Sequence, residues 1–173
     1  MGRRGFTLVE LLIVLAVGSI LLAIAVPGYG FLMNTSRLAA VTNDLVSALQ
    51  LARSEAIKHG ARVTVCKTSN PMAAQAFCDN TANWHEGWLV FSDDGTRGVI
   101  DSGDTLLRVQ ERLSGGANIT SSSPYHYVSY RPSGMSQGSN GLANGTISVC
   151  LEGSRRDIII SRAGRIRLNS GTC

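Results

Sequence analysis

The amino-acid sequence predicts an α+β protein in which one long N-terminal α-helix packs on an antiparallel β-sheet domain. Two observations predict the helix: an apolar run from Phe6 to Val26, and a stripe of apolar residues at helical spacing after it. A third predicts the sheet, because short β-like runs broken by glycine, asparagine and serine fill the chain after Gly60. A chain of 173 residues has room for such a helix and one modest globular domain.

The apolar run is the first element and is predicted to be a transmembrane helix. At ~1.5 Å per residue, a helix from Phe6 to Val26 is long enough to cross a bilayer core of ~30 Å. Glu10 is the one ionisable residue within it. Since a carboxylate in lipid is unfavourable unless it is paired, Glu10 needs a partner.

Three ordinary interpretations of this run stay open. A membrane anchor explains its length and the positive flank of Arg3 and Arg4, but it does not explain Glu10. A secretory signal would be cleaved after the small residues of Ala23-Ile24-Ala25. The third interpretation is a buried core helix. N-terminal sequencing of the mature protein separates these cases, because a secretory signal would leave Val26 at the new N-terminus.

The second element is an amphipathic helix that continues the first beyond Pro27 and Gly28, which are expected to bend it. Charged residues such as Arg53 lie off the apolar stripe, and Gly60 is the predicted terminator. We therefore expect one long, bent helix from Phe6 to His59. The apolar stripe consists of Leu38, Val41, Leu45, Leu49, Ala52 and Ala56.

The remaining elements are short strands with turn residues between them. Turn chemistry at Asp94-Gly95, Ser114-Gly115-Gly116 and Asn144-Gly145 separates them, and Ser133–Asn144 is predicted to be a mobile loop. No repeat or second domain is evident in the sequence. The predicted strands are Arg62–Lys67, Trp88–Phe91, Thr105–Arg112, Tyr125–Tyr130, Thr146–Leu151, Asp157–Ser161 and Arg165–Asn169.

The start of the chain resembles a known processing signal. Gly5-Phe6-Thr7-Leu8-Val9-Glu10 is similar to the class III signal of type IV pilins and type II secretion pseudopilins. The resemblance implies that a prepilin peptidase cuts after Gly5 and that the new N-terminal Phe6 is methylated. It also implies a partner for Glu10, namely the free N-terminal amine of a neighbouring subunit during assembly. A buried charge pair of this kind is expected to fix the register between neighbouring subunits rather than to add much net stability.

The same resemblance implies a pilin-like division of the chain. Residues 1–5 would be a leader peptide that is removed. Residues 6–33 would form the transmembrane half of the helix, which becomes part of the filament core. Residues 34–173 would form the globular domain, with the amphipathic half of the helix packed on it, facing the periplasm or the exterior. Before assembly the protein would be a single-pass protein of the inner membrane.

Further motifs narrow the resemblance to one branch of this family. The segment Leu45–Ala56 is similar to the L-x-x-A-L-x-x-A-R-S-E-A pattern of the minor pilins FimT and FimU and the pseudopilin GspH. Gly87–Phe91, the following Asp93-Asp94-Gly95 and the C-terminal Gly164-Arg165 also resemble that group. The resemblance implies a filament subunit near the tip that primes pilus assembly together with major and minor pilins.

The four cysteines form an even number in a domain that this resemblance places in the periplasm, so disulfides are expected. We favour Cys66–Cys78 and Cys150–Cys173, because each pair closes a local loop of polar, turn-rich sequence. A zinc site is the alternative. The absence of any C-x-x-C pair argues against it.

A DNA-binding site is the second hypothesis that the resemblance supplies. FimT proteins of natural transformation carry a C-terminal G-R-x-R motif implicated in DNA binding, and here it reads Gly164-Arg165-Ile166-Arg167. If Arg162-Ala163-Gly164 forms a hairpin turn, strand alternation places Arg165 and Arg167 on one face, two residues apart at ~3.3 Å per residue. Ile166 and Leu168 would then face the core. The predicted DNA-binding residues are Arg162, Gly164, Arg165 and Arg167.

Charge and chemistry leave this hypothesis open. The formal net charge is +4, and loss of Arg3 and Arg4 with the leader would lower it by two. Arginine forks suit phosphate oxygens and bind them without reading sequence. The alternative is a solvated strand face, or one that pairs with acidic residues of other pilins. Further arginines that could extend the patch are Arg131, Arg155 and Arg156.

Enzymatic, metal and cofactor sites are not expected. The three histidines share no metal or triad spacing, and no serine or cysteine nucleophile has a recognisable base beside it. The aspartates near Asp93 lack the pattern of a calcium loop, so we expect turn-forming roles. Trp84 and Trp88 are expected to anchor packing.

Together these observations favour a minor type IV pilin that primes pilus assembly and binds extracellular DNA during natural transformation. The main alternative is a GspH-like minor pseudopilin of a type II secretion system. A second alternative is an anchored periplasmic enzyme, for which the sequence offers no site.

Overall fold

The computed structural model describes residues 6–122 and 125–173. The chain divides between Ser36 and Arg37 into an N-terminal unit and a C-terminal unit. The elements are α1 (Leu8–His59), β1 (Val63–Lys67), the 3₁₀ turn η1 (Trp84–Glu86), β2 (Trp88–Ser92), β3 (Leu106–Gln110), β4 (Asn118–Ser121), β5 (Tyr127–Tyr130), β6 (Ser136–Gly138), β7 (Gly145–Leu151), β8 (Ser154–Ile160) and β9 (Ile166–Thr172).

The N-terminal unit contains the first part of α1. The helix begins at Leu8, two residues later than expected, because Thr7 caps it: its Oγ1 accepts a hydrogen bond of 3.3 Å from the backbone N–H of Glu10. It continues without a break through Pro27 and Gly28, as the prediction of one long helix requires. A proline removes one hydrogen bond of the helix, and the turns on either side keep theirs.

Apolar side chains of the N-terminal unit are exposed along the helix, as Phe6 (81%) and Leu21 (63%) illustrate. By length and composition α1 can cross a membrane, and none of its most apolar window is buried. Apolar surface of this extent is unfavourable in water, so lipid or other protein must cover it.

The C-terminal unit begins with the second part of α1, whose apolar stripe is confirmed. All six stripe residues are buried, and Leu45, Leu49 and Ala52 are fully so. The helix ends at His59, and Gly60 follows in the left-handed conformation with φ of +66°. Glycine takes that conformation without the steric penalty of a Cβ, which accounts for the predicted terminator.

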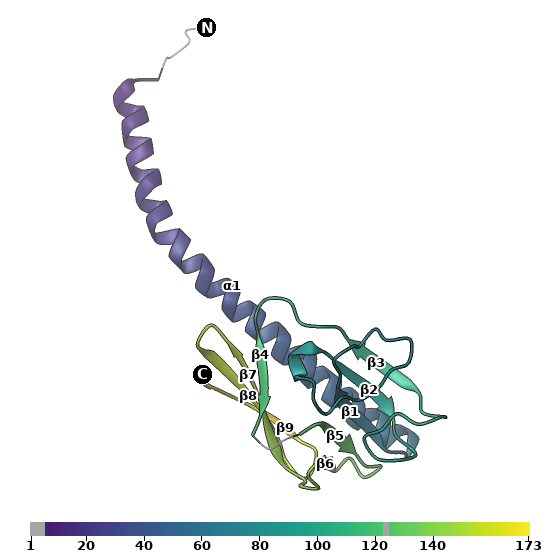
Figure 1. Ribbon diagram of the computed structural model, residues 1–173. Helices are drawn as coiled ribbons and strands as arrows, with labels where there is room; N and C mark the ends of the chain where they lie inside the picture. The colour runs from purple at the N-terminus through teal and green to yellow at the C-terminus, as the bar shows by residue number, and fades with distance from the viewer. Residues whose placement is uncertain (1–5, 123–124) are drawn as a thin grey trace. The chain divides into compact units, whose positions relative to one another are not determined.

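The strands are antiparallel, as the sequence predicts, but they form two sheets rather than one. One has the strand order β3-β2-β1-β5-β6, and the other has the order β4-β7-β8-β9 (Figure 1). In the second sheet β7, β8 and β9 form a meander with β9 at the edge. The C-terminal motif therefore lies at a sheet edge, on β9 and the turn before it.

One core cluster joins the stripe of α1 to both sheets. It includes Leu49 of α1, Val65 of β1 and Ile147 of β7, none of which is exposed. Both tryptophans anchor this core, as expected. Trp88 is fully buried, and the indole N–H of Trp84 donates a 3.0 Å hydrogen bond to the carbonyl of Tyr125.

The seven predicted strands are found, with shifted ends, and two strands were missed. The first is β4, and the second is β6, which lies inside the segment Ser133–Asn144 that was predicted to be a loop. That prediction is wrong because β6 has no apolar alternation and is held by its ladder with β5, in which Ser129 pairs with Gln137. Strand β8 also begins earlier than expected, at Ser154 rather than Asp157.

Two disulfides staple the C-terminal unit, and they join the pairs that the sequence favours. Cys66 of β1 bonds Cys78, with Cα atoms 5.6 Å apart, and Cys150 of β7 bonds Cys173 at the C-terminus, with Cα atoms 5.9 Å apart. All four cysteines of the sequence are thus paired. The second bridge ties the C-terminus, just after the edge strand β9, to the end of β7.

Candidate functional site

The predicted C-terminal hairpin is present and is formed by β8 and β9. Ile160 pairs with Ile166, and the turn between them is closed by hydrogen bonds from Ser161 N–H to the Arg165 carbonyl (2.9 Å) and from Gly164 N–H to the Ser161 carbonyl (2.8 Å). Arg162 lies at the tip of this turn and is exposed. The hairpin therefore presents the predicted DNA-binding residues at one end of the second sheet.

Gly164 is required by packing rather than by chemistry. It is buried, and its φ of +73° is a conformation that favours glycine. A Cβ at this position would collide with the carbonyl oxygen of Gly134 and come within 3.0 Å of the Arg53 Nε. The glycine of the motif thus lets the β8–β9 turn press against a second turn.

Arg53 of α1 ties these two turns together. Its Nε donates to the Gly134 carbonyl at 3.2 Å and its guanidinium donates to the Ala163 carbonyl at 2.9 Å. The sequence placed Arg53 on the solvated side of the helix, and its structural role was missed. The signal available was the A-R-S-E-A pattern, which resembled the family but carried no spatial information.

The second turn runs from Arg131 to Met135 and is built like the first. Gly134 N–H donates to the Arg131 carbonyl at 2.8 Å, and Arg131 N–H donates to the Met135 carbonyl at 3.0 Å. Ser136 fastens this turn to the β8–β9 turn, because its N–H donates to the Arg162 carbonyl (3.2 Å) and its hydroxyl donates to the Ser161 carbonyl (2.8 Å). We call residues 131–136 and 161–165 the two-turn platform.

Two arginines of the motif extend from this platform without internal partners. Arg165 and Arg167 are exposed, and across residues 6–122 and 125–173 neither guanidinium makes a hydrogen bond or ion pair. Arg167 pairs with Ile159, which is 38% exposed, whereas Ile158 and Ile160 beside it are buried. Arg167 therefore lies on the outer face of the sheet, as predicted from strand alternation.

Leu168 does not behave as predicted. It shares the inner face with Ile158, its pairing partner, yet it is 49% exposed. Strand β9 lies at the edge of its sheet, and there Leu168 lines a shallow groove with Ala39 of α1 and Arg156. Ile166, nearer the turn, does pack on the core.

Arg155 and Arg156 do not extend the patch formed by Arg165 and Arg167. Arg155 forms an ion pair with Asp157, with Nε and Oδ1 3.1 Å apart, so its charge is largely neutralised. Arg156 pairs with Ser170 across the ladder and donates to its hydroxyl at 2.7 Å. Alternation places Arg156 on the inner face, opposite to Arg167.

Tyr130 lies beneath the two-turn platform and shapes its interior. It is fully buried, and its phenolic oxygen has no hydrogen-bond partner among the residues described. Burial raises the pKa of Tyr130, and the nearby positive charge of Arg53 opposes this rise only in part. The Tyr130 side chain is therefore neutral at physiological pH, and the two-turn platform packs on an uncharged aromatic ring.

The aspartate-rich segment after β2 forms turns, as expected. Asp93 is fully buried, forms an ion pair of 3.1 Å with Arg62 and accepts a 2.9 Å hydrogen bond from the N–H of Gly98. Asp104 accepts hydrogen bonds from the N–H groups of Asp94 and Asp101. In the part of the chain that the structure describes, no three His, Cys, Asp or Glu side chains are placed to hold a metal ion.

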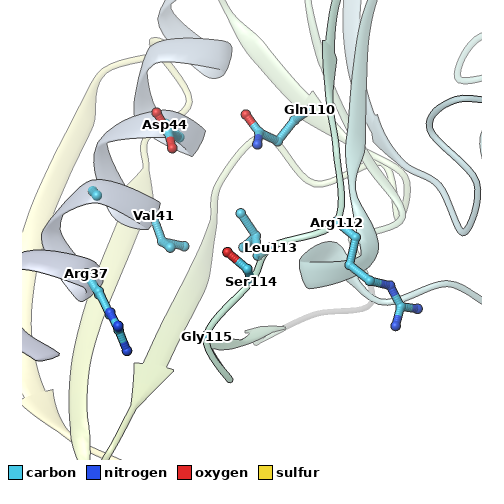
Figure 2. A pocket seen from close by; sticks show the side chains of 9 residues that line it. Arg37, Val41, Asp44, Gln110, Arg112, Leu113, Ser114 and Gly115 are labelled. Atoms are coloured by element: carbon cyan, nitrogen blue, oxygen red, sulfur yellow. The ribbon is translucent and has the colours of Figure 1, made fainter.

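One cavity in the C-terminal unit has mixed character. About 470 Å³ in volume, it lies between α1 and the segment after β3, with Asp44 and Arg37 on one wall and Leu113 on the other (Figure 2). Arg112, at its edge, forms an ion pair of 2.7 Å with Glu86. The cavity combines charges of both signs, and its lining residues do not form an arrangement of catalytic groups.

Of the predicted processing site, Gly5 lies outside the described residues. Phe6 is exposed, and Glu10 occupies the first turn of α1, where it follows the capping Thr7 by three residues. The hydrogen bond at this helix start is made by the backbone N–H of Glu10 and the Thr7 hydroxyl.

Comparisons with solved structures identify the fold. The fold matches the type IV minor pilin FimU of Pseudomonas aeruginosa PAO1, with a TM-score of 0.59 and 21% identity over 80% of this chain and 92% of that one. It also matches the minor pseudopilin EpsH from the Type 2 Secretion System of Vibrio cholerae, with a TM-score of 0.52 and 14% identity over 78% of this chain and 97% of that one. The fold is therefore that of the minor pilins and pseudopilins.

Sequence comparisons identify the family. Residues 1–26 match the prokaryotic N-terminal methylation motif, and residues 41–164 match the family described as type II transport protein GspH. The chain belongs to the GspH family. It is also 28% identical over 181 residues to the pilin-like protein PilA1 of Thermus thermophilus, in a match that covers 97% of this chain and 99% of that protein. The predicted family is confirmed, and the pilins and pseudopilins that this chain resembles are structural proteins rather than enzymes.

Proposed function

We propose that this protein is a minor pilin that enters a type IV pilus near its tip and primes assembly. The observation that carries the proposal is the contrast within α1: apolar and exposed in the N-terminal unit, buried by the chain's own core in the C-terminal unit. The exposed half suits packing first with inner-membrane lipid and then with other major and minor pilins. The globular unit remains outside the bilayer.

In this proposal, a prepilin peptidase removes residues 1–5 and Phe6 becomes the methylated N-terminus. The match to the N-terminal methylation motif supports this step. Glu10 then meets the amine of a neighbouring subunit and sets its register. A Glu10→Gln variant should be cleaved normally and should be absent from sheared pili, whereas a Thr7→Ala variant, which loses only the cap, should still assemble. Equal incorporation of Glu10→Gln and the unchanged protein would contradict this role.

We further propose that the two-turn platform binds extracellular DNA through Arg165 and Arg167, with Arg162 beside them. Three features support this: the arginines are exposed, Arg165 and Arg167 lack internal partners among the described residues, and a rigid pair of turns positions them. Contacts from arginine to phosphate oxygens do not depend on base sequence, so the expected binding is sequence-independent. Gly164 contributes the packing of the turn rather than a contact to DNA.

DNA affinity measured against salt tests this function. For the full chain in a neutral detergent, log affinity should fall linearly with log salt, by ~0.9 per phosphate neutralised on duplex DNA. Arg165→Ala/Arg167→Ala should bind more weakly with a shallower slope. Arg37→Ala/Lys58→Ala removes two charges from α1 and serves as the matched control, which should bind as the unchanged protein does. Equal binding by all three proteins would overturn the DNA role.

A minor pseudopilin of a type II secretion system is the second candidate function. The match of residues 41–164 to the GspH family favours it specifically, and the fold fits both systems. Deletion of the gene distinguishes them. Loss of piliation and transformation would support the pilus, whereas loss of exoprotein secretion with normal piliation would support the secretion system.

A further inference from the structure

A small cavity lies at the two-turn platform, and neither Arg165 nor Arg167 is among its lining residues. Its volume is about 120 Å³, which is room for several water-sized groups, since one water needs only ~10–15 Å³ of such space. Arg131 from one turn and Arg162 from the other both line it. Neutral residues such as Met135 and Ala143 complete the lining.

The charge of this cavity is one-sided. Two arginines line it, one from each turn, and none of its lining residues is acidic. The hydrogen bond that Arg131 makes with a side chain is to the neutral amide oxygen of Gln137, at 2.8 Å. Two like charges that share a cavity disfavour each other unless an anion lies between them. The residues that form the cavity therefore complement an anion and not a cation.

The cavity is also rigid, because its walls are fixed from behind. The Ser136 hydroxyl is engaged by the carbonyls of Ala143 (2.7 Å) and Ser161 (2.8 Å), and Arg53 holds the carbonyls of Gly134 and Ala163. With the serine donor occupied, the two arginines supply the donors for a ligand. An arginine fork matches two oxygens of a tetrahedral phosphate in a bidentate manner, and Arg131 is held in place by its hydrogen bond to Gln137.

We propose that Arg131 and Arg162 form a binding site for one phosphate group, supplied by the backbone of DNA. The source of the phosphate rests on the proposed DNA function, whereas the affinity for a phosphate anion rests on the cavity alone. The site adds one anchored phosphate contact to those of Arg165 and Arg167. It also gives the two-turn platform a function that the hairpin motif by itself does not have.

Titration with inorganic phosphate tests the cavity independently of DNA. In the full chain in dodecyl maltoside, the NMR signals of the Arg131 and Arg162 Nε–H groups should shift with phosphate and saturate. Chloride at equal ionic strength should leave them unchanged. Arg97, which lies over the ring of Tyr127 at 5.9 Å, is the internal control and should not respond. Absence of a saturable shift, or equal shifts for all arginines, would overturn the site.

A DNA titration with Arg131→Gln/Arg162→Gln tests the source of the phosphate. With Arg165 and Arg167 intact, the slope of log affinity against log salt should become shallower by ~0.9, the value for one phosphate on duplex DNA. Normal DNA binding with an unchanged slope would overturn the inference and leave the proposed function standing. Saturable phosphate binding in a protein that binds no DNA would support the anion site and overturn the proposed DNA function.

Discussion

The two halves of α1 are made of similar apolar residues but have opposite surroundings. Leu21 in the N-terminal unit is 63% exposed, whereas Leu49 in the C-terminal unit is fully buried in the core that joins both sheets. One half exposes its apolar side chains, and the other buries them against its own chain. The proposed function assigns the exposed half to assembly, and the contrast predicts different consequences for the same substitution in each half.

The largest expected difference is between two leucines of α1. Leu49→Ala should lower the free energy of unfolding of the C-terminal unit by ~2–5 kcal/mol, because it leaves a cavity in a closed core. Leu21→Ala should change it by less than ~0.5 kcal/mol, as for an exposed site. Urea unfolding followed by near-UV circular dichroism in detergent measures both. Comparable losses of unfolding free energy in the two variants would contradict the contrast between the exposed and buried halves of α1.

Three glycines sharpen the comparison. Gly164→Ala should destabilise the C-terminal unit by ~2–4 kcal/mol, because the left-handed backbone and the packing on Gly134 both oppose a Cβ. Gly153→Ala, at φ of +77° with nothing near the added atom, isolates the backbone part and should cost ~1–2 kcal/mol. Gly18→Ala in the N-terminal unit should cost nothing, since alanine is the better helix former. In thermal unfolding, Gly164→Ala should have the lowest melting temperature, Gly153→Ala an intermediate one, and Gly18→Ala that of the unchanged protein.

Arginines on the second half of α1 give the next effect. Arg53→Ala should lower the free energy of unfolding by ~1.5–3 kcal/mol, because it removes hydrogen bonds to two carbonyls that its charge strengthens. Arg37→Ala, elsewhere on the same helix, should leave the free energy of unfolding almost unchanged. Hydrogen exchange checks the reason, since protection of the Gly134 and Gly164 amides should fall in Arg53→Ala alone. Unchanged protection there would mean that the two turns hold together without Arg53.

The smallest effect concerns alkaline pH. Burial raises the pKa of Tyr130, so above pH ~10 the unfolded chain ionises this tyrosine while the folded chain keeps it neutral. Its contribution to stability is thus complete below pH ~10 and declines as pH rises, by up to ~1.4 kcal/mol for each unit. Tyr130→Phe should show a smaller loss of stability between about pH 8 and pH 11 in urea unfolding. Identical losses would contradict the role of Tyr130.

Regular patterns made much of this molecule predictable. The stripe from Leu38 to Ala56 is a local property, since the helical period places those residues on one face wherever the chain is put. The turn at Gly164 also follows from local signals, as do the disulfide pairs that close short loops. Strand β6 and the exposure of Leu168 were not predictable, because the first depends on a neighbouring strand and the second on position in a sheet.

The sequence by itself determined the family of the protein and the two parts of its long helix, one apolar and one amphipathic. The signal around Glu10, the apolar run and the motifs near Arg53 and Gly164 indicate the family, because they are short and read along the chain. Only the tertiary structure decided which arginines lie together. Arg53, Arg131 and Arg162 lie far apart in sequence, and it is the packing of two turns on one helix that brings them to a single platform.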